Sequence, residues 1–327
     1  MIRFGVIGTS WITDHFIDAG LTSDDFELAA VYSRTQENAD AFAAKHNIPL
    51  TFTSLAALAA SPDIDAVYIA SPNVLHADQA ITCMQGGKHV LVEKPAASNA
   101  REYEKMAAAA QENGVLLMEA MKSTFTPTFL AIRDQLEAIG PVRRYFASYC
   151  QYSGSFGEYA SGGSPNVFDP AMSTGGLMDL GVYCLYPLIA LFGEPERITA
   201  KGRLLDTGAD VAGSLLLKYA DMDAVVHYSK MTDSYARSEI QGENGTIVFE
   251  KISRPDFAEI RFRDGTTKTL TAPQAKNAMT YEVREFIGLL NRGSKESTVN
   301  SHAVSLATLR TMDEARRQMG VAFPADR

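Results

Sequence analysis

Cysteine and tryptophan are scarce in this chain of 327 residues, which has three of the first and one of the second. An odd number of cysteines in apolar segments argues against the disulfide framework of a secreted protein and predicts reduced thiols in the cytoplasm. Neither H-E-x-x-H nor C-x-x-C occurs, so no metal site is expected. A G-x-S-x-G nucleophile elbow is missing too, which argues against a serine hydrolase.

Positive charge is also in deficit, because the formal net charge is -9 at pH 7. This balance argues against nucleic acid or an anionic membrane as the main partner. Met1-Ile2-Arg3 leads straight into an apolar strand, unlike a signal peptide. No apolar stretch is expected to approach the ~20 residues that span a bilayer. We therefore expect a soluble cytoplasmic protein, and the length suggests two domains.

The first 120 residues alternate between short apolar runs and helix-compatible segments. Strands are expected at 2–7, 28–32, 66–69, 90–92 and 115–118, and helices at 12–21, 36–46, 75–85 and 100–113. Short apolar strands separated by helices are typical of a parallel sheet covered on both faces. We predict a doubly wound α/β domain of the Rossmann type over residues 1–122.

The pattern changes after a helix at 129–138. Successive strands are expected at 211–219, 224–231, 237–241, 246–250, 258–263 and 267–270, with helices near 175–192, 279–291 and 302–318. Asn244-Gly245 and Asp264-Gly265 between β-rich runs indicate hairpins. Residues 123–327 are therefore predicted to form an α+β domain with a largely antiparallel, open-faced sheet, which binds substrate and dimerises.

An incomplete dinucleotide-binding loop follows the first strand, where residues 8–13 read GTSWIT. The full motif G-x-G-x-x-G lets a helix N-terminus meet the pyrophosphate. Ser10 and Thr13 replace the second and third glycines, although a serine still offers an amide and a hydroxyl. A plain strand–turn–helix with glycine at the turn is the alternative. The residues predicted to bind the cofactor here are Gly8, Thr9, Ser10, Trp11 and Ile12.

The second strand ends in Ser33-Arg34-Thr35. NAD-specific domains usually place an acid there to bind the ribose 2′-hydroxyl. A guanidinium beside hydroxyls suits a 2′-phosphate instead, so Ser33 and Arg34 predict NADP, with NAD as a possible substitute. The alternative is a surface arginine at a helix start, where a cation opposes the helix dipole.

Glu93-Lys94-Pro95 ends another predicted strand, at the edge where open α/β sheets bind ligands. Pro95 restricts Lys94 to extended backbone angles and permits a cis bond, so it can fix the direction of the ammonium. For an isolated lysine, the alternative is a side chain that reaches from the sheet edge to solvent.

Several segments together resemble the Gfo/Idh/MocA oxidoreductases, and the resemblance covers nearly the whole chain. The segments are Ser71-Pro72-Asn73-Val74-Leu75-His76, Glu93-Lys94-Pro95, Met118-Glu119-Ala120 and Gly175-Gly176-Leu177-Met178-Asp179-Leu180-Gly181-Val182-Tyr183. The resemblance implies NAD(P)-dependent hydride transfer at a carbinol or carbonyl carbon, usually of a sugar or polyol. Tyr183, where many members have histidine, looks more like the glucose–fructose oxidoreductase and dihydrodiol dehydrogenase branch.

The resemblance also implies roles for single residues. Lys94, Asp179 and Tyr183 correspond to active-site residues of the family. Other positions correspond to neighbours of the cofactor: Ser71, Asn73, His76 and Glu93, with Lys94. Many members have an aromatic residue and an arginine where this chain has Met121-Lys122-Ser123. The resemblance therefore does not indicate which substrate this chain recognises.

The residues themselves support this chemistry. Asp179 and Tyr183 are spaced i, i+4 on an expected helix and so share one face. Oxidising an alcohol needs a proton acceptor, for which Lys94 and Tyr183 are the candidates, while Asp179 orients substrate hydroxyls or the lysine. In reduction the Lys94 ammonium donates a proton or stabilises the alkoxide. A helix of ordinary core and cap residues is the alternative for Asp179 and Tyr183.

Three classes of function follow from these features, of which the third is a structural dimer module only. The first is an NADP-dependent oxidoreductase acting on a sugar, polyol or dihydrodiol-like substrate. The second is a regulator on the same fold that binds NAD(P) or sugar without turnover. Apolar residues on both sides of the strand at 211–219 predict a homodimer or higher oligomer.

Overall fold

Six parallel strands form one sheet in the computed structural model, which describes all residues 1–327. Their order is β3-β2-β1-β4-β5-β6, so the chain reverses direction across the sheet between β1 and β4. This is the doubly wound dinucleotide-binding order, which confirms the predicted Rossmann fold. The strands are β1 Ile2–Ile7, β2 Phe26–Tyr32, β3 Leu50–Phe52, β4 Ala66–Ile69, β5 His89–Glu93 and β6 Leu117–Ala120.

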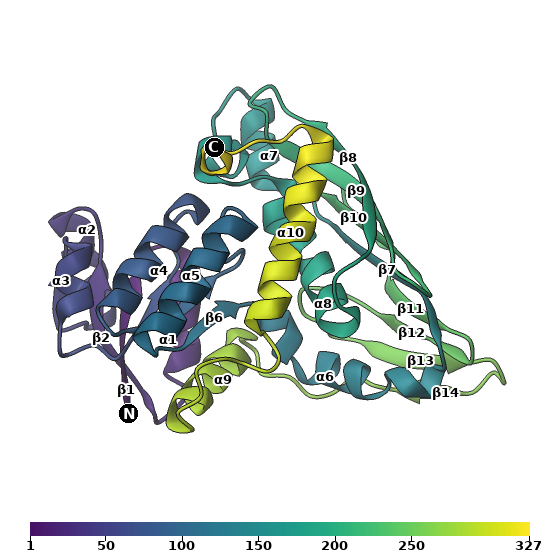
Figure 1. Ribbon diagram of the computed structural model, residues 1–327, viewed down its shortest axis with the longest axis horizontal. Helices are drawn as coiled ribbons and strands as arrows, with labels where there is room; N and C mark the ends of the chain where they lie inside the picture. Colours follow the sequence, from purple (N-terminus) through teal and green to yellow (C-terminus); the bar gives the residue numbers. More distant parts are fainter. The chain divides into compact units, whose positions relative to one another are not determined.

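Helices cover this sheet and connect its strands. Helix α4 packs between α3 and α5, and Figure 1 shows α4 and α5 side by side. Helix α9 comes from much later in the chain and packs on α1, where its Phe286 lies 5.9 Å from Phe4 of β1 between ring centres. The helices are α1 Trp11–Gly20, α2 Gln36–His46, α3 Leu55–Ala60, α4 His76–Gln85, α5 Ala100–Asn113 and α9 Met279–Asn291.

The packing of α9 decides how the chain divides. The first compact unit comprises Met1–Met121 and Ala275–Ser305, and the second comprises Lys122–Gln274 and Leu306–Arg327. The sequence places one boundary near residue 122, whereas the structure adds a later segment to the first unit.

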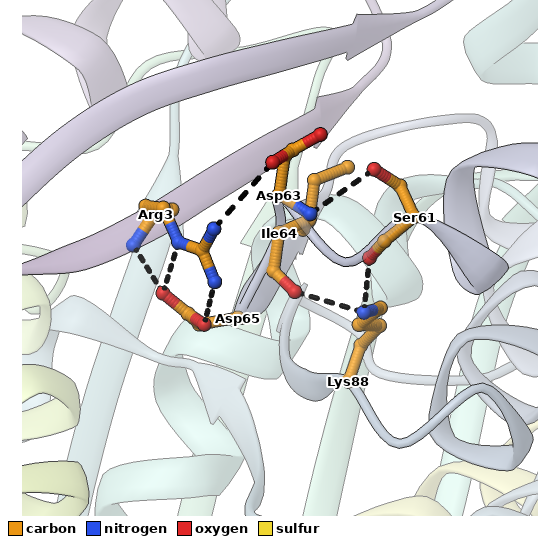
Figure 2. Close-up of polar contacts among 6 residues, drawn as sticks. All are labelled: Arg3, Ser61, Asp63, Ile64, Asp65 and Lys88. Carbon is orange, nitrogen blue, oxygen red and sulfur yellow. Dashed lines mark hydrogen bonds and ion pairs between the residues drawn. The ribbon is translucent and has the colours of Figure 1, made fainter.

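A polar cluster ties together the amino ends of β1, β4 and β5 (Figure 2). The Arg3 guanidinium pairs with both carboxylate oxygens of Asp65, at 2.7 and 3.0 Å. The Lys88 ammonium is buried and donates to the carbonyl oxygens of Ser61 at 2.5 Å and Ile64 at 2.8 Å. Burial lowers the pKa of Lys88. This cluster fixes the edge of the sheet opposite the carboxyl ends of the strands.

The second unit holds an eight-stranded sheet of order β14-β13-β12-β11-β7-β10-β9-β8. Only β7 and β10 pair in parallel, so the largely antiparallel sheet is confirmed. The strands are β7 Val142–Cys150, β8 Arg197–Leu204, β9 Asp210–Lys218, β10 Asp223–Ser229, β11 Ser238–Gly242, β12 Gly245–Phe249, β13 Ala258–Phe262 and β14 Thr267–Thr269.

The helices of this unit lie on one face of its sheet (Figure 1). They include α6 Pro127–Asp134, α7 Gly154–Ala160, α8 Val182–Phe192 and most of α10 His302–Met319. Strand β9 alternates accordingly: Leu215 and Leu217 are buried, whereas Ser214, Leu216 and Lys218 are exposed. One face of the sheet therefore carries no helix.

One helical stretch, Pro170–Phe192, is long and apolar enough to cross a membrane by length and composition, with a mean hydropathy of 1.5. The expectation that no apolar stretch approaches this length is wrong for this segment. Of its most apolar window, 78% is buried inside the fold, where α8 packs against β7 and β10. This burial is that of a helix in the core of a folded unit.

Candidate functional site

Most of the predicted cofactor residues lie where β1, β2, β4 and β5 end at their carboxyl edge. Because these strands are neighbours in a parallel sheet, the structure brings the loops that follow them to one edge. The loop after β1 contains Gly8, and the loop after β2 contains Arg34. His76 follows β4 at the start of α4, and Lys94 follows β5 directly.

Gly8 adopts a backbone conformation, in a confined place, that a residue with a side chain cannot adopt. Its φ is +104°, and a Cβ there would lie 2.5 Å from the carbonyl oxygen of Ala70. The chain then enters α1 with Ser10 as N-cap, whose side chain makes no capping hydrogen bond. Ser10, Thr9 and Trp11 are exposed, and Ile12 is half-buried. This close turn into an open helix N-terminus fits a dinucleotide phosphate.

The end of β2 presents a positive charge. Arg34 is exposed and Ser33 is half-buried, and Thr35 caps α2 by accepting from the backbone N–H of Asn38 at 3.3 Å. Because Thr35 takes the capping position, Arg34 stands outside the helix rather than in its first turn. The arrangement fits a 2′-phosphate through charge.

His76 connects the ends of β4 and β5. Its Nδ1 lies 3.0 Å from the carbonyl oxygen of Pro95, and its Nε2 lies 2.8 Å from that of Ser71. The ring is buried, and burial lowers its pKa. The Ser71 hydroxyl donates to Gln79 at 2.6 Å, and Asn73 begins the short helix before α4. The imidazole thus joins two loops of the candidate site.

Glu93 anchors the start of the Lys94 turn. One carboxylate oxygen accepts from the Tyr68 hydroxyl at 2.6 Å, and the other accepts from the backbone N–H of Lys94 at 3.2 Å. Lys94 is half-buried, and the Lys94–Pro95 bond is cis. The backbone of the lysine is therefore held from within the sheet.

Glu119, near the end of β6, is a functional candidate that the sequence reasoning missed. Its side chain is buried, and Oε1 accepts from the backbone N–H of Ala96 at 3.0 Å. Burial raises the pKa of this carboxyl to about 7. The available signal was its place in Met118-Glu119-Ala120, a segment that resembles the family but to which no role was given.

The predicted pair Asp179 and Tyr183 lies in the second unit, on the helical stretch that leads into α8. Asp179 belongs to a π-helical turn, Leu177–Gly181, and Tyr183 is the second residue of α8. The buried carboxylate of Asp210 holds this turn by accepting from the backbone N–H of Leu177 at 2.7 Å. A side chain at Gly175 would collide with that carboxylate, which explains a glycine there.

Two lysines beside this pair were not predicted. The Lys230 ammonium lies 2.5 Å from the Asp179 carboxylate, and only 7% of the Lys230 side chain is exposed. The Lys122 ammonium lies 5.7 Å from the centre of the Tyr183 ring, which also meets Tyr149 edge to face at 5.7 Å. A cationic and aromatic group of side chains thus surrounds Asp179 and Tyr183.

Comparison with known proteins agrees with this fold. Residues 2–121 match the NAD-binding Rossmann-fold domain of the GFO/IDH/MocA oxidoreductase family, and residues 129–248 match the family's C-terminal domain. The chain belongs to this family, as its sequence motifs predict.

Two relatives and one solved structure are similar to this chain over nearly its whole length. The chain is 51% identical to the scyllo-inositol 2-dehydrogenase (NADP(+)) IolU of Bacillus subtilis (strain 168), over all of this chain and 99% of that protein. It is 32% identical to trans-1,2-dihydrobenzene-1,2-diol dehydrogenase of Mus musculus, over all of this chain and 99% of that enzyme. The crystal structure of KijD10, a 3-ketoreductase from Actinomadura kijaniata in complex with NADP and TDP-benzene, matches with a TM-score of 0.85 at 24% identity, covering 97% of this chain and 98% of that one.

Proposed function

We propose that this protein is an NADP-dependent dehydrogenase of cyclic polyols, which transfers a hydride between the cofactor and a ring carbon that bears a hydroxyl or carbonyl group. The observation that carries the choice of substrate is the 51% identity, over the whole chain, with a relative named as an NADP-dependent inositol dehydrogenase. Arg34, exposed after β2, supports the choice of NADP.

NADP, when bound, accepts or supplies the hydride. Gly8, Thr9, Ser10, Trp11 and Ile12 are proposed to hold its phosphates, and Ser33 and Arg34 its 2′-phosphate. Ser71, Asn73, His76 and Glu93 are proposed to border its nicotinamide half. The first unit would then be the cofactor-binding domain, and the second the substrate-binding domain.

Lys94 is proposed to carry the proton transfer that accompanies hydride transfer. In reduction its ammonium donates a proton to the carbonyl oxygen, and in oxidation the neutral amine takes the hydroxyl proton. Tyr183 assists, and Asp179 orients a substrate hydroxyl as an acceptor. The Lys230 ammonium supports Asp179 because the ion pair holds this carboxylate in place.

The assay follows reduced nicotinamide by absorbance with NADP and a panel of inositol isomers, aldoses and trans-diols. We expect turnover with at least one inositol and a fall in kcat of about 100-fold or more in Lys94→Ala, since general acid–base catalysis contributes about 10²–10⁴-fold. Lys105→Ala removes an exposed lysine of α5 and should keep the parental rate. Tight NADPH binding without turnover on any member of the panel would favour the regulator instead.

We further propose that the protein is a cytoplasmic homodimer that uses the helix-free face of the second sheet. Leu216, Val225 and Phe146 lie opposite one another across β9, β10 and β7 and form an outward apolar row. Leu216 is 52% exposed. An apolar row of this kind favours self-association. The three cysteines are free thiols, which agrees with a reducing compartment.

A further inference from the structure

A buried acid lies behind the Lys94 turn and has no role in the chemistry described above. Glu119 is 1% exposed and belongs to β6, where it pairs in register with Val92 of β5. Glu93 and Lys94 follow Val92 directly. The β5–β6 pairing therefore places this carboxyl one strand away from the base of the lysine.

The Glu119 side chain holds the far side of the turn. Its Oε1 accepts from the backbone N–H of Ala96, two residues after Lys94, at 3.0 Å, and it also bonds the Ser305 side chain. The Asn300 amide donates to the carbonyl oxygens of Glu119 and Met121, at 3.0 and 3.2 Å, which fixes the backbone of β6. The other carboxyl oxygen, Oε2, is buried and meets no donor.

The surroundings of Glu119 both raise and lower the pKa of its carboxyl group. Burial and the negative charge of Glu93 disfavour its ionised form, while the Lys94 ammonium and the two hydrogen bonds favour it. Burial is the largest effect and raises the pKa of Glu119 to about 7. The titratable groups that face this region are Glu93 at the end of β5, Lys94 after it, Tyr103 of α5, and Glu296 and His302 beyond Tyr103.

We propose that Glu119 is a positioning residue for Lys94: its carboxylate holds the backbone N–H of Ala96, and so fixes the turn that aims the lysine ammonium. A charged acceptor makes a hydrogen bond about twice as strong as a neutral one. Protonation of Glu119 therefore loosens the turn. Because the proposal rests on Lys94 being the proton-transfer residue, its first test is one that needs no substrate.

That first test is a pH titration of the Ala96 backbone amide by NMR, in the full-length protein labelled with ¹⁵N. We expect the Ala96 amide proton to move downfield as the pH rises from 5.5 to 8.5, with a midpoint near the pKa of Glu119, about 7. In Glu119→Gln, which keeps an acceptor oxygen but cannot ionise, the movement should vanish. If the movement persists in that variant, the hydrogen bond does not respond to Glu119 and the proposal fails.

The second test is the pH dependence of kcat. In the parental protein kcat should rise as Glu119 ionises, whereas Glu119→Gln should lack this step and run threefold to tenfold slower at pH 8. Glu119→Ala, which also removes the acceptor, should be slower still at every pH, with little change in NADPH affinity. Glu282→Gln alters a buried glutamate of α9 and should keep the parental profile.

The two tests separate the possible failures. A parental protein without turnover, but with a titrating Ala96 amide, would refute the proposed reaction and leave the hydrogen-bond role standing. A Glu119→Gln variant with the parental kcat and pH profile would overturn the positioning role. A melting temperature measured for each variant shows whether the fold is kept. Equal losses of kcat in Glu119→Gln and Glu282→Gln would also overturn the positioning role.

Discussion

The side chain of Arg34 is where this protein would distinguish NADP from NAD. It follows β2, is exposed, and has no acid beside it that could bind a ribose 2′-hydroxyl. We expect Arg34→Ala to raise KM for NADP by about 10- to 100-fold, since a charge-assisted contact to phosphate contributes about 1.5–3 kcal/mol. KM for NAD should change little and serves as the internal control. An equal rise for both cofactors would assign Arg34 to general stability rather than to the 2′-phosphate.

Single residues could be read from the sequence where they interrupt a pattern. Lys94 and Arg34 stood out because each follows a strand that is otherwise apolar. Glu119 and Lys230 did not, because their roles depend on partners far along the chain. Glu119 meets Ala96, and Lys230 meets Asp179, only after the strands and helices have assembled.

At the scale of elements, short apolar runs between helix-compatible segments predicted most of the parallel sheet, and Asn244-Gly245 and Asp264-Gly265 predicted hairpins. Strand β3 and helix α3 were not predicted, because Leu50–Phe52 and Leu55–Ala60 are too short to show a repeating spacing of apolar residues. The first strand of the second sheet, β7, also escaped, since Arg143-Arg144 breaks the apolar run at its start. The helix expected near 175–192 exists, but it begins with a π-helical turn. The spacing of apolar residues does not predict such a turn.

The π-helical turn places Asp179 next to the end of β10. There its carboxylate pairs with the buried side chain of Lys230. Lys230→Met removes the ammonium that pairs with the Asp179 carboxylate. We expect KM for the polyol to rise and kcat to fall, together reducing kcat/KM by at least about 10-fold, since an ion pair with a buried member matters more than an exposed one.

Lys251→Met offers a matched control for this prediction. It breaks a pair of similar length, 2.6 Å to Asp256, in which the lysine is 67% exposed. Exposed pairs of this kind contribute about 0–1 kcal/mol, so kcat/KM should not change. Equal effects of the two substitutions would place the role of Lys230 outside the site.

At the scale of the whole molecule, the helix-free face of the second sheet should govern assembly. Leu216→Glu puts a charge at the β9 end of the apolar row with Val225 and Phe146, and should shift the protein from dimer toward monomer at micromolar concentration. Sedimentation equilibrium measures the change.

Leu21→Glu is the control for assembly, because Leu21 is also an exposed leucine, at 68%, but lies in the first unit at the end of α1. This variant should remain a dimer. A parental protein that sediments as a monomer, or a Leu216→Glu dimer of unchanged affinity, would contradict the proposed interface.

The single tryptophan gives the molecule a built-in optical probe. Trp11 is the first residue of α1, directly after the Gly8 turn, and is 69% exposed. No second indole is present, so the tryptophan emission, excited apart from the 13 tyrosines, reports from this one helix start. Quenching of that emission, or energy transfer from it to reduced nicotinamide, follows events at the phosphate loop in the unmodified protein, without a label or a substrate.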